Sequence, residues 1–430
     1  MQQERIITKW PANRWVSPLI ILTLTLILTG RPFPAPAESH FEQTADLRAS
    51  ALIAPELLKN NLYTVDETVV NDGLLNHYRV RSIYGDFRVV STQSVNQLLR
   101  EIQAIALMKR VETADTVKDS VVQSGKNTVD AVTNLVTNPQ ETLEGAAAGV
   151  NNLFYRATNV VGRRSTTAAE DSKVEQFIGK SKSKGDIATK YGVNVYSTNP
   201  ILQEELDRLA WADYLGGIGV GLAQSAIPGV GGLLLSTSGT ARLLNEVINS
   251  TPASELWVRN RDKLVAMGVN PDTVELYLNN PAFTPALQTV MVEALEKLTG
   301  AANRDLFIKI SLQAHTHQMA KTITIMSTMI AGYHLNVEPL QDFTPFARVL
   351  SATTASGARV LIIPADHILW SELVAQGALW LDSGQSANPQ VVNKQLWILG
   401  DFRARAEAEL QALGWELHPR AQKILFTEDV

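Results

Sequence analysis

The residues best suited to acid–base chemistry are Asp366 and His367, which are adjacent in the sequence. They follow an apolar run that is typical of a strand, and catalytic side chains often lie where a strand ends. An aspartate beside a histidine could act as a general acid or base in a hydrolase-like enzyme. No nucleophile motif accompanies the pair, so Asp366 and His367 are candidate catalytic residues without a defined reaction.

A second group of histidines is His315-Thr316-His317, with His334 downstream. The surrounding apolar pattern predicts a helix, on which residues two positions apart point roughly 200° away from each other. One metal ion could not bind both side chains on such a helix. We therefore interpret them as ordinary, partly exposed histidines and expect no metal site.

Two glycine-containing segments fail as nucleotide-binding motifs. Gly179-Lys180-Ser181 resembles the end of a phosphate-binding loop, but Val174 stands where that motif has its first glycine. Gly217 and Gly219 begin a G-x-G-x-x-G pattern, but Leu222 replaces its third glycine. Serine-hydrolase, zinc-protease and calcium-loop patterns are also absent from the sequence. No cofactor is expected, and the motifs favour a non-enzymatic role.

A long neutral tract, residues 215–240, organises the middle of the chain. It lies between Asp213 and Arg242 without a charged residue, and it exceeds the roughly 20 apolar residues that cross a bilayer. Ile227-Pro228-Gly229 interrupts it, because proline and glycine favour a turn. We expect two helices folded into a hairpin that is buried in a helical domain. The alternative is a hairpin that inserts into or lies on a membrane.

The N-terminus has the features of a secretory signal peptide. Basic residues precede an apolar run at residues 15–28, and Ala35-Pro36-Ala37 follows it. This order predicts a signal peptide at residues 1–37 that is cleaved after Ala37, and the alternative is an uncleaved membrane anchor. We therefore expect an exported, periplasmic or extracellular protein.

Composition agrees with export and argues against nucleic-acid binding. The chain has 430 residues, a formal net charge of −5 and no cysteine. The predicted signal peptide is basic, so the mature protein would be more acidic still, which disfavours nucleic acid as a partner. The lack of cysteine excludes disulfides and thiol catalysis, and it suits an oxidising envelope compartment.

The patterns predict a mainly α fold with an N-terminal β-hairpin or small antiparallel sheet, a central multi-helix domain that buries the Gly-rich hairpin, and a small C-terminal α/β domain. Beyond the signal peptide, the expected parts are a β-hairpin plus helix at 38–110, amphipathic helices at 111–164, a polar linker at 165–184, a helical domain at 185–335 and the α/β domain at 336–430.

The N-terminal sheet is predicted from turn residues and alternation. Asn71-Asp72-Gly73 and Tyr84-Gly85-Asp86 read as turns between strands at 63–70, 78–83 and 87–91. Ser94 is expected to cap the helix that follows. In the C-terminal part, residues 346–352 and 358–363 are predicted as strands around a turn at Ala355-Ser356-Gly357. Strands at 395–399 and 415–418 with a helix at 403–413 between them suggest a βαβ-like unit.

Helix starts in the central part are marked by a capping residue followed by proline. The four pairs are Asn199-Pro200, Thr251-Pro252, Asn270-Pro271 and Thr284-Pro285. A last helix is expected over residues 303–331.

The segment at residues 112–162 is the expected interaction surface. Val117, Val121, Val132 and Val136 form a thin apolar stripe among Thr, Ser, Asn and Asp. Valine is a mediocre helix former, so such helices need a partner surface. That surface is either the protein's own core or another protein, including a second copy. The polar residues argue against lipid, since membrane-surface helices carry Lys, Arg and bulky aromatic residues.

Several phrases together resemble a family of uncharacterised exported bacterial proteins. They are Val70-Asn71-Asp72-Gly73 with Tyr84-Gly85-Asp86, residues 191–200, Arg261-Asp262-Lys263-Leu264 with Met267-Gly268-Val269, and residues 280–285. The resemblance implies export and a shared fold over most of the mature chain, and it implies no catalytic residue. We therefore expect an exported envelope protein with a binding or structural role.

Overall fold

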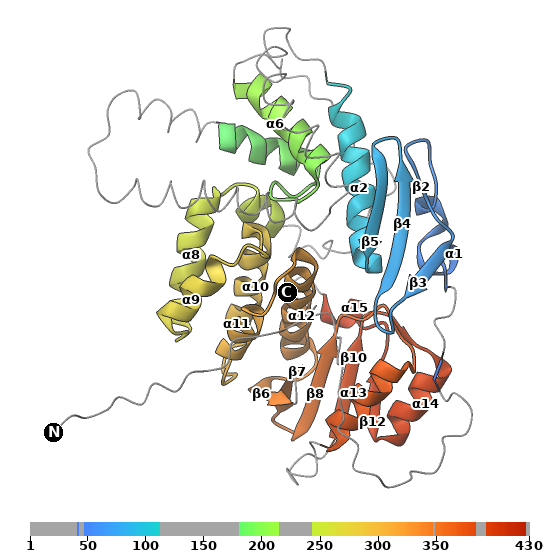
Figure 1. Cartoon of the computed structure of the whole chain (residues 1–430). Helices are drawn as coiled ribbons and strands as arrows, with labels where there is room; N and C mark the ends of the chain where they lie inside the picture. The colour runs from blue at the N-terminus through green and yellow to red at the C-terminus, as the bar shows by residue number, and fades with distance from the viewer. Residues whose placement is uncertain are drawn as a thin grey trace, which may run out of the picture.

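The computed structural model describes residues 41–42, 47–111, 180–214, 243–346, 349–383 and 393–426 (Figure 1). The predicted signal peptide, the helices expected at 112–164 and the tract at 215–240 lie outside the described residues and stay predictions. Among the described residues, no helix has both the length and the apolar character needed to cross a membrane.

The N-terminal unit is a five-stranded antiparallel sheet that packs on one long helix. Its elements are β1 Leu47–Arg48, α1 Ala49–Leu52, the 3-10 helix η1 Pro55–Leu57, β2 Tyr63–Val65, β3 Thr68–Asn71, β4 Asn76–Ser82, β5 Gly85–Val90 and α2 Thr92–Met108. The predicted hairpin is confirmed as β4 and β5, which pair from His77 with Val90 to Ser82 with Gly85. The single strand expected at 63–70 is divided into β2 and β3, because the register against β4 changes at residues 66–67.

Helix α2 is buried on two sides. Val95, Leu99 and Ile102 pack against the sheet. Ile105 and Met108, further along, belong to a separate core with the helix at residues 180–190 and with α6, Pro200–Tyr214. One amphipathic helix therefore joins the sheet to the helical part of the chain.

The cap of α2 differs from the prediction. Ser91, and not Ser94, is the N-cap, and its side chain accepts a hydrogen bond from the backbone N–H of Ser94 at 3.2 Å. Ser91 adopts φ +79°, a conformation that few residues other than glycine adopt. That backbone geometry decides which of two serines three residues apart can cap the helix, and the sequence does not reveal it.

The helical part continues through α8 Ala253–Ala266, α9 Pro271–Leu278, α10 Pro285–Lys297, α11 Asp305–Ser311 and α12 His317–Asn336, after a π-helical turn, η2, at Leu243–Ile248. The predicted caps of α9 and α10 are confirmed: Asn270 accepts from Asp272 and Thr273, and Thr284 accepts from Leu287. At Thr251-Pro252, however, Pro252 is the N-cap of α8, and no side chain caps that helix.

Two expectations for this part were wrong. The single helix expected at 303–331 is two helices, because the chain turns between Ser311 and His317 and Thr316 caps α12 by accepting from Met319 at 3.2 Å. Residues 180–184, expected at the end of a polar linker, belong to the helix at 180–190.

The C-terminal part is a five-stranded mixed sheet of order β12-β10-β8-β7-β6. Its elements are β6 Leu340–Phe346, β7 Val349–Thr354, β8 Ala358–Ile363, β9 His367–Ile368, α13 Glu372–Ser383, β10 Asn393–Ile398, β11 Asp401–Phe402, α14 Ala404–Ala412, β12 Trp415–His418 and α15 Gln422–Leu425. Strands β8, β10 and β12 are parallel, so the predicted βαβ-like unit is confirmed and extends to three strands.

Helices cover both faces of this sheet (Figure 1). Along β8, Val360 and Ile362 enter the core that contains α12 and α15, whereas Leu361 and Ile363 face α13 and α14. Such near-continuous apolar strands are typical of parallel sheets buried on both sides. The described chain is therefore a mixed structure of helices and two main sheets, in which the α/β part shares its core with the helices before it.

Helix α12 requires glycine at its contact with α15. A Cβ built on Gly332 would lie 1.9 Å from the carbonyl oxygen of Leu425. We expect Gly332→Ala to lower the free energy of unfolding by about 1–3 kcal/mol, because the two backbones must separate. Gly377, inside α13, is the matched control, since nothing lies within 4 Å of its built Cβ. Gly377→Ala should stabilise by about 0.5–1 kcal/mol. Urea unfolding of both variants measures the difference, and equal effects would contradict the close contact.

The cap of α2 gives a second prediction. Ser91→Ala removes the acceptor for the Ser94 N–H and should cost about 1 kcal/mol of unfolding free energy. Ser94→Ala keeps that acceptor and loses only the contact between the two hydroxyls at 3.0 Å, so it should cost less. Thermal unfolding of the pair compares them, and a larger loss for Ser94→Ala would restore Ser94 as the cap.

Candidate functional site

The carboxyl ends of the parallel strands bring the predicted pair to one edge of the C-terminal sheet. Asp366 and His367 follow β8, Asp401 follows β10, and Arg420 follows β12. The two-stranded pair β9 and β11 extends this edge, and Arg420 donates to Asp401 Oδ1 at 2.7 Å. In open α/β sheets this is the edge where ligands usually bind.

Here the N-terminal unit covers part of that edge. In Figure 1 the lower ends of β3 and β4 reach the C-terminal sheet. The turn between them supplies carbonyl groups to the chain after β8: Leu74 O accepts from Asp366 N at 2.9 Å, and Gly73 O accepts from Leu369 N at 3.1 Å. Gly73 has φ +111°, so this tight approach depends on glycine. The turn lies where a ligand of this sheet would be expected.

The carboxylate of Asp366 binds backbone groups of the N-terminal unit. Its Oδ2 accepts from Asn76 N at 3.0 Å, and both oxygens lie 3.1 Å from Thr92 N. Thr92 is the first residue of α2, so Asp366 places a carboxylate at a helix N-terminus, where the helix dipole favours negative charge. Burial raises the pKa of Asp366 to about 6, and the hydrogen bonds from Asn76 and Thr92 oppose that rise.

His367 is directed to a different partner. Its Nδ1 accepts from the Asn76 side-chain amide at 3.3 Å, and its backbone oxygen accepts from Asn71 Nδ2 at 3.4 Å. Asn71 Nδ2 also donates to Asn76 Oδ1 at 2.8 Å, so the two asparagines bridge the turn to β9. Burial lowers the pKa of His367 and favours the neutral ring.

The hydroxyl groups nearby are engaged with each other. Tyr78 Oη and Thr92 Oγ1 lie 2.6 Å apart, and Asn76 Nδ2 is 3.3 Å from Tyr78 Oη. Burial raises the pKa of Tyr78 to about 12, so the phenol stays protonated. Neither hydroxyl has a hydrogen bond to His367 among the described residues.

This geometry differs from that of a catalytic aspartate–histidine pair. In such a pair the carboxylate hydrogen-bonds to the imidazole and orients it toward a nucleophile. Asp366 instead binds two backbone N–H groups, and His367 binds an asparagine. The structure places both predicted residues at one edge of the sheet, and it uses them to hold the two sheets together.

His315, His317 and His334 lie in different surroundings. His315 is exposed in the turn between α11 and α12, and His317 is the first residue of α12, so the expectation that one helix carries both was wrong. His317 donates from Nδ1 to Ala282 O at 3.3 Å, and burial lowers its pKa to about 4. His334 is buried and accepts from Leu340 N at 3.0 Å. Within the described residues, no three His, Asp or Glu side chains are grouped to hold a metal ion.

A second buried polar cluster joins α2 to the helical part. Glu101 accepts from Ser197 Oγ at 2.8 Å, from Asn199 Nδ2 at 3.0 Å and from Gln97 Nε2 at 2.9 Å. Gln97 in turn accepts from Lys321 Nζ at 2.7 Å, and burial lowers the pKa of Lys321 to about 8. All of these donors and acceptors are matched, so the cluster acts as a connection between α2, residues 197–199 and α12.

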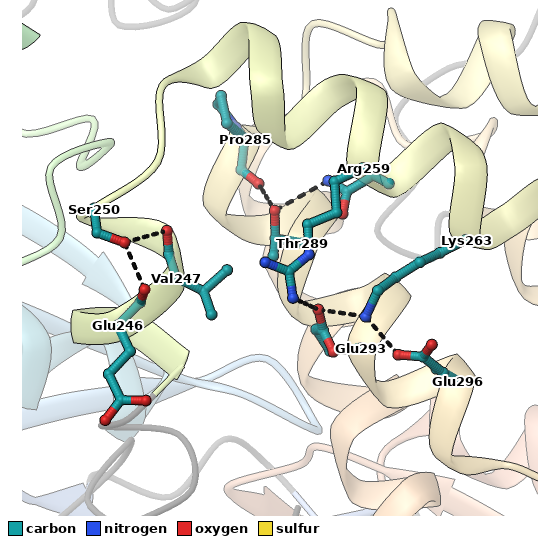
Figure 2. A network of polar contacts seen from close by, with 10 residues as sticks. Glu246, Val247, Ser250, Arg259, Lys263, Pro285, Thr289, Glu293 and Glu296 are labelled. Atoms are coloured by element: carbon teal, nitrogen blue, oxygen red, sulfur yellow. Dashed lines mark hydrogen bonds and ion pairs between the residues drawn. The ribbon is translucent and has the colours of Figure 1, made fainter.

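A third network lies between α8 and α10. Figure 2 shows Lys263 between Glu293 and Glu296, at 2.8 and 2.5 Å, and Arg259 directed to Glu293 at 3.5 Å. Two bases thus meet two acids. Lys263 and Glu293 are partly buried, whereas Arg259 and Glu296 are exposed, so the outer pairs contribute little to stability. The four charges balance, and the network leaves no excess charge that would select a ligand.

Sequence reasoning missed most residues around Asp366. Asn71 was assigned to the turn, and Asn76, Thr92 and Gly400 were not singled out. A Cβ on Gly400 would lie 1.6 Å from Asp366 O, so this glycine lets the β10 end approach the β8 end. Asn76 and Thr92 are 290 and 274 positions from Asp366 in the sequence, and no local pattern connects them.

Comparison with protein-family models, curated proteins and solved structures finds no match for the chain. The resemblance to exported bacterial proteins therefore stays a prediction, and the site is defined by its geometry alone.

The raised pKa of Asp366 predicts a pH-dependent stability difference. In the unfolded chain the carboxyl has its ordinary pKa of 3.8, so between that pH and about 6 the folded state holds more protons and stability falls as pH rises. The change amounts to about 3 kcal/mol at most. An asparagine at position 366 cannot titrate. Its NH2 group would replace one of the two carboxylate oxygens that face Asn76 N and Thr92 N, so Asp366→Asn lowers the stability at every pH.

The loss caused by Asp366→Asn should therefore be larger at pH 4.5 than at pH 7. Urea unfolding of both proteins at the two pH values gives the difference, in which other titrating groups cancel. His367→Asn serves as the local control, since it leaves the carboxylate in place. A loss that is smaller at pH 4.5 than at pH 7 would contradict a buried carboxyl with a raised pKa.

Proposed function

We propose that the chain is an exported envelope protein that acts by binding another envelope protein, or a second copy of itself, and not by catalysis. The observation that carries this proposal is the use of the Asp366 carboxylate. It accepts the backbone N–H groups of Asn76 and Thr92 and thereby attaches the N-terminal unit to the edge where the parallel strands end.

The energetics of that edge support the proposal. A substrate reaching Asp366 would have to break the bonds to Asn76 and Thr92 and displace the turn at residues 72–75. Leaving a buried donor unsatisfied costs about 1–3 kcal/mol for each group. A carboxylate that is held by these hydrogen bonds is a poor general acid or base. The binding surface is then expected away from this edge, and the sequence pattern proposes the segment at 112–162, which lies outside the described residues.

The alternatives remain separate proposals. A hydrolase-like enzyme would use the Asp366 carboxyl, whose pKa near 6 suits proton transfer at neutral pH. Membrane association would use the tract at 215–240, which lies outside the described residues. No contact in the described structure favours either over a binding role.

The test is recovery of a partner from the envelope. A tagged chain is expressed with its N-terminus intact, cross-linked in cells and purified from the envelope fraction. We expect a discrete cross-linked species, which should be lost when residues 112–164 are deleted and weakened when Val121 and Val132 are replaced by Ser. Thr128→Ser with Thr133→Ser is the matched control and should leave the species unchanged.

His367→Ala separates binding from catalysis in the same assay. It should leave the cross-linked species at the wild-type level. A chain without any cross-linked partner would contradict the proposal, and so would one whose physiological effect depends on the His367 ring while partner recovery does not change.

A further inference from the structure

The N-terminal sheet has two faces of different chemistry. Tyr78 and Val80 of β4 point into the core against α2, and Phe87 and Val89 of β5 pack against the same core. Because side chains alternate along a strand, Arg79 and Arg88 point to the opposite face, where both are exposed. The outer face is thus open, and it carries arginine.

Three arginines lie on this face. Arg79 of β4 and Arg88 of β5 are direct cross-strand partners, so their backbones are about 5 Å apart. On the other side of β4 the register shifts by two residues: Asp66 N donates to Arg79 O at 2.9 Å, and Val70 pairs with His77. Thr68, between these contacts, pairs with Arg48 of β1, so Arg48 lies one strand further along the sheet. We call Arg48, Arg79 and Arg88 the arginine row.

Several neighbouring charged or polar side chains have partners, whereas the arginine row has none among the described residues. Arg81 binds Asp66 at 2.9 Å, and His77 binds Asp72 at 2.9 Å. Glu67 accepts from Ser50. The three guanidinium groups of the row have no hydrogen bond or ion pair with any described residue. Asp86, the one acid on these strands, lies opposite Arg81 and makes no ion pair with the row.

This arrangement costs stability, since like charges directly opposite each other on a sheet repel. It also stands out in a protein whose formal net charge is −5. A positive row kept free of internal acids complements a negatively charged partner. Carboxylates suit it best, because the planar guanidinium group binds a carboxylate through two parallel hydrogen bonds.

The composition of the outer face favours a protein as its binding partner over a lipid bilayer. Strands β1 to β5 contain arginine and no lysine, and their aromatic side chains point inward. Protein interfaces are enriched in Arg and depleted in Lys, whereas membrane-surface segments combine basic residues with outward bulky apolar groups. Val70, 54% exposed, adds a small apolar contact beside the row.

We propose that the arginine row is the docking surface for an acidic segment of a partner protein, whose carboxylates bind Arg48, Arg79 and Arg88 across the sheet. This inference rests on the proposed binding function and names the chemistry of the partner. Arg79 and Arg88, as direct neighbours, are the centre of the surface.

The test uses fluorescein-labelled poly-L-glutamate as the acidic probe and fluorescence anisotropy with the purified chain. We expect Arg79→Glu with Arg88→Glu to weaken binding by at least about ten-fold, and added salt to weaken wild-type binding. Lys182→Glu with Lys423→Glu is the matched control, because both lysines are exposed and the net charge changes equally. It should change the affinity less than two-fold.

The single variant Arg88→Glu tests whether weaker binding could result from unfolding. Arg88→Glu replaces a repulsive cross-strand pair with an attractive one opposite Arg79, so it should raise the melting temperature while weakening the binding of the probe. A variant that is more stable yet binds less cannot have lost binding through unfolding.

Three results would overturn the inference. They are a wild-type chain that does not bind poly-L-glutamate, equal weakening in the lysine control, and binding only to vesicles of 30% phosphatidylglycerol in phosphatidylethanolamine. Envelope cross-linking distinguishes this failure from failure of the proposed function. If the Arg79→Glu, Arg88→Glu chain recovers its partner at the wild-type level, the arginine row is refuted and the binding function stands.

Discussion

The carboxylate of Asp366 is the contact on which the arrangement of the two sheets depends. It lies at the end of β8, it is buried, and it accepts from Asn76 N and Thr92 N. A buried carboxylate is costly unless it is hydrogen-bonded, and these N–H groups would themselves be costly if left unpaired. Each side of the contact therefore needs the other, and together they determine where the β3–β4 turn and the start of α2 can lie.

The two buried polar clusters hold α2 at two different positions along the helix. Asp366 binds its first turn, and Glu101, in its middle, binds residues 197–199. Apolar packing on two sides of the helix gives most of the favourable free energy, but it is not directional. Hydrogen bonds to buried acids add the specificity that fixes the rotation of the helix. With these two interior acids used in this way, the three unpaired arginines on the outer face of the N-terminal sheet stand apart from the polar contacts that hold α2.

The sequence allowed prediction of local elements and little of what joins them. Short apolar segments next to turn residues located β8 and β12 at their observed bounds, and a cap followed by proline located the starts of α9 and α10, because those signals act within a few residues. The split between α11 and α12 was missed, since apolar residues continue at helical spacing on both sides of the turn. Asp366 and His367 were recognised as notable, but their role depends on Asn76, 290 positions away. No periodicity reports a contact of that separation.

The separation between Asp366 and Asn76 also has a consequence for how the chain is made. A ribosome adds roughly 5–20 residues per second, so the backbone of Asn76 waits about 15–60 s for its acceptor to be synthesised. During that interval the first turn of α2 has its own Ser91 cap but lacks the distant carboxylate. An N-terminal sheet that formed before residue 366 was available would therefore lack the acceptor for its Asn76 N–H group.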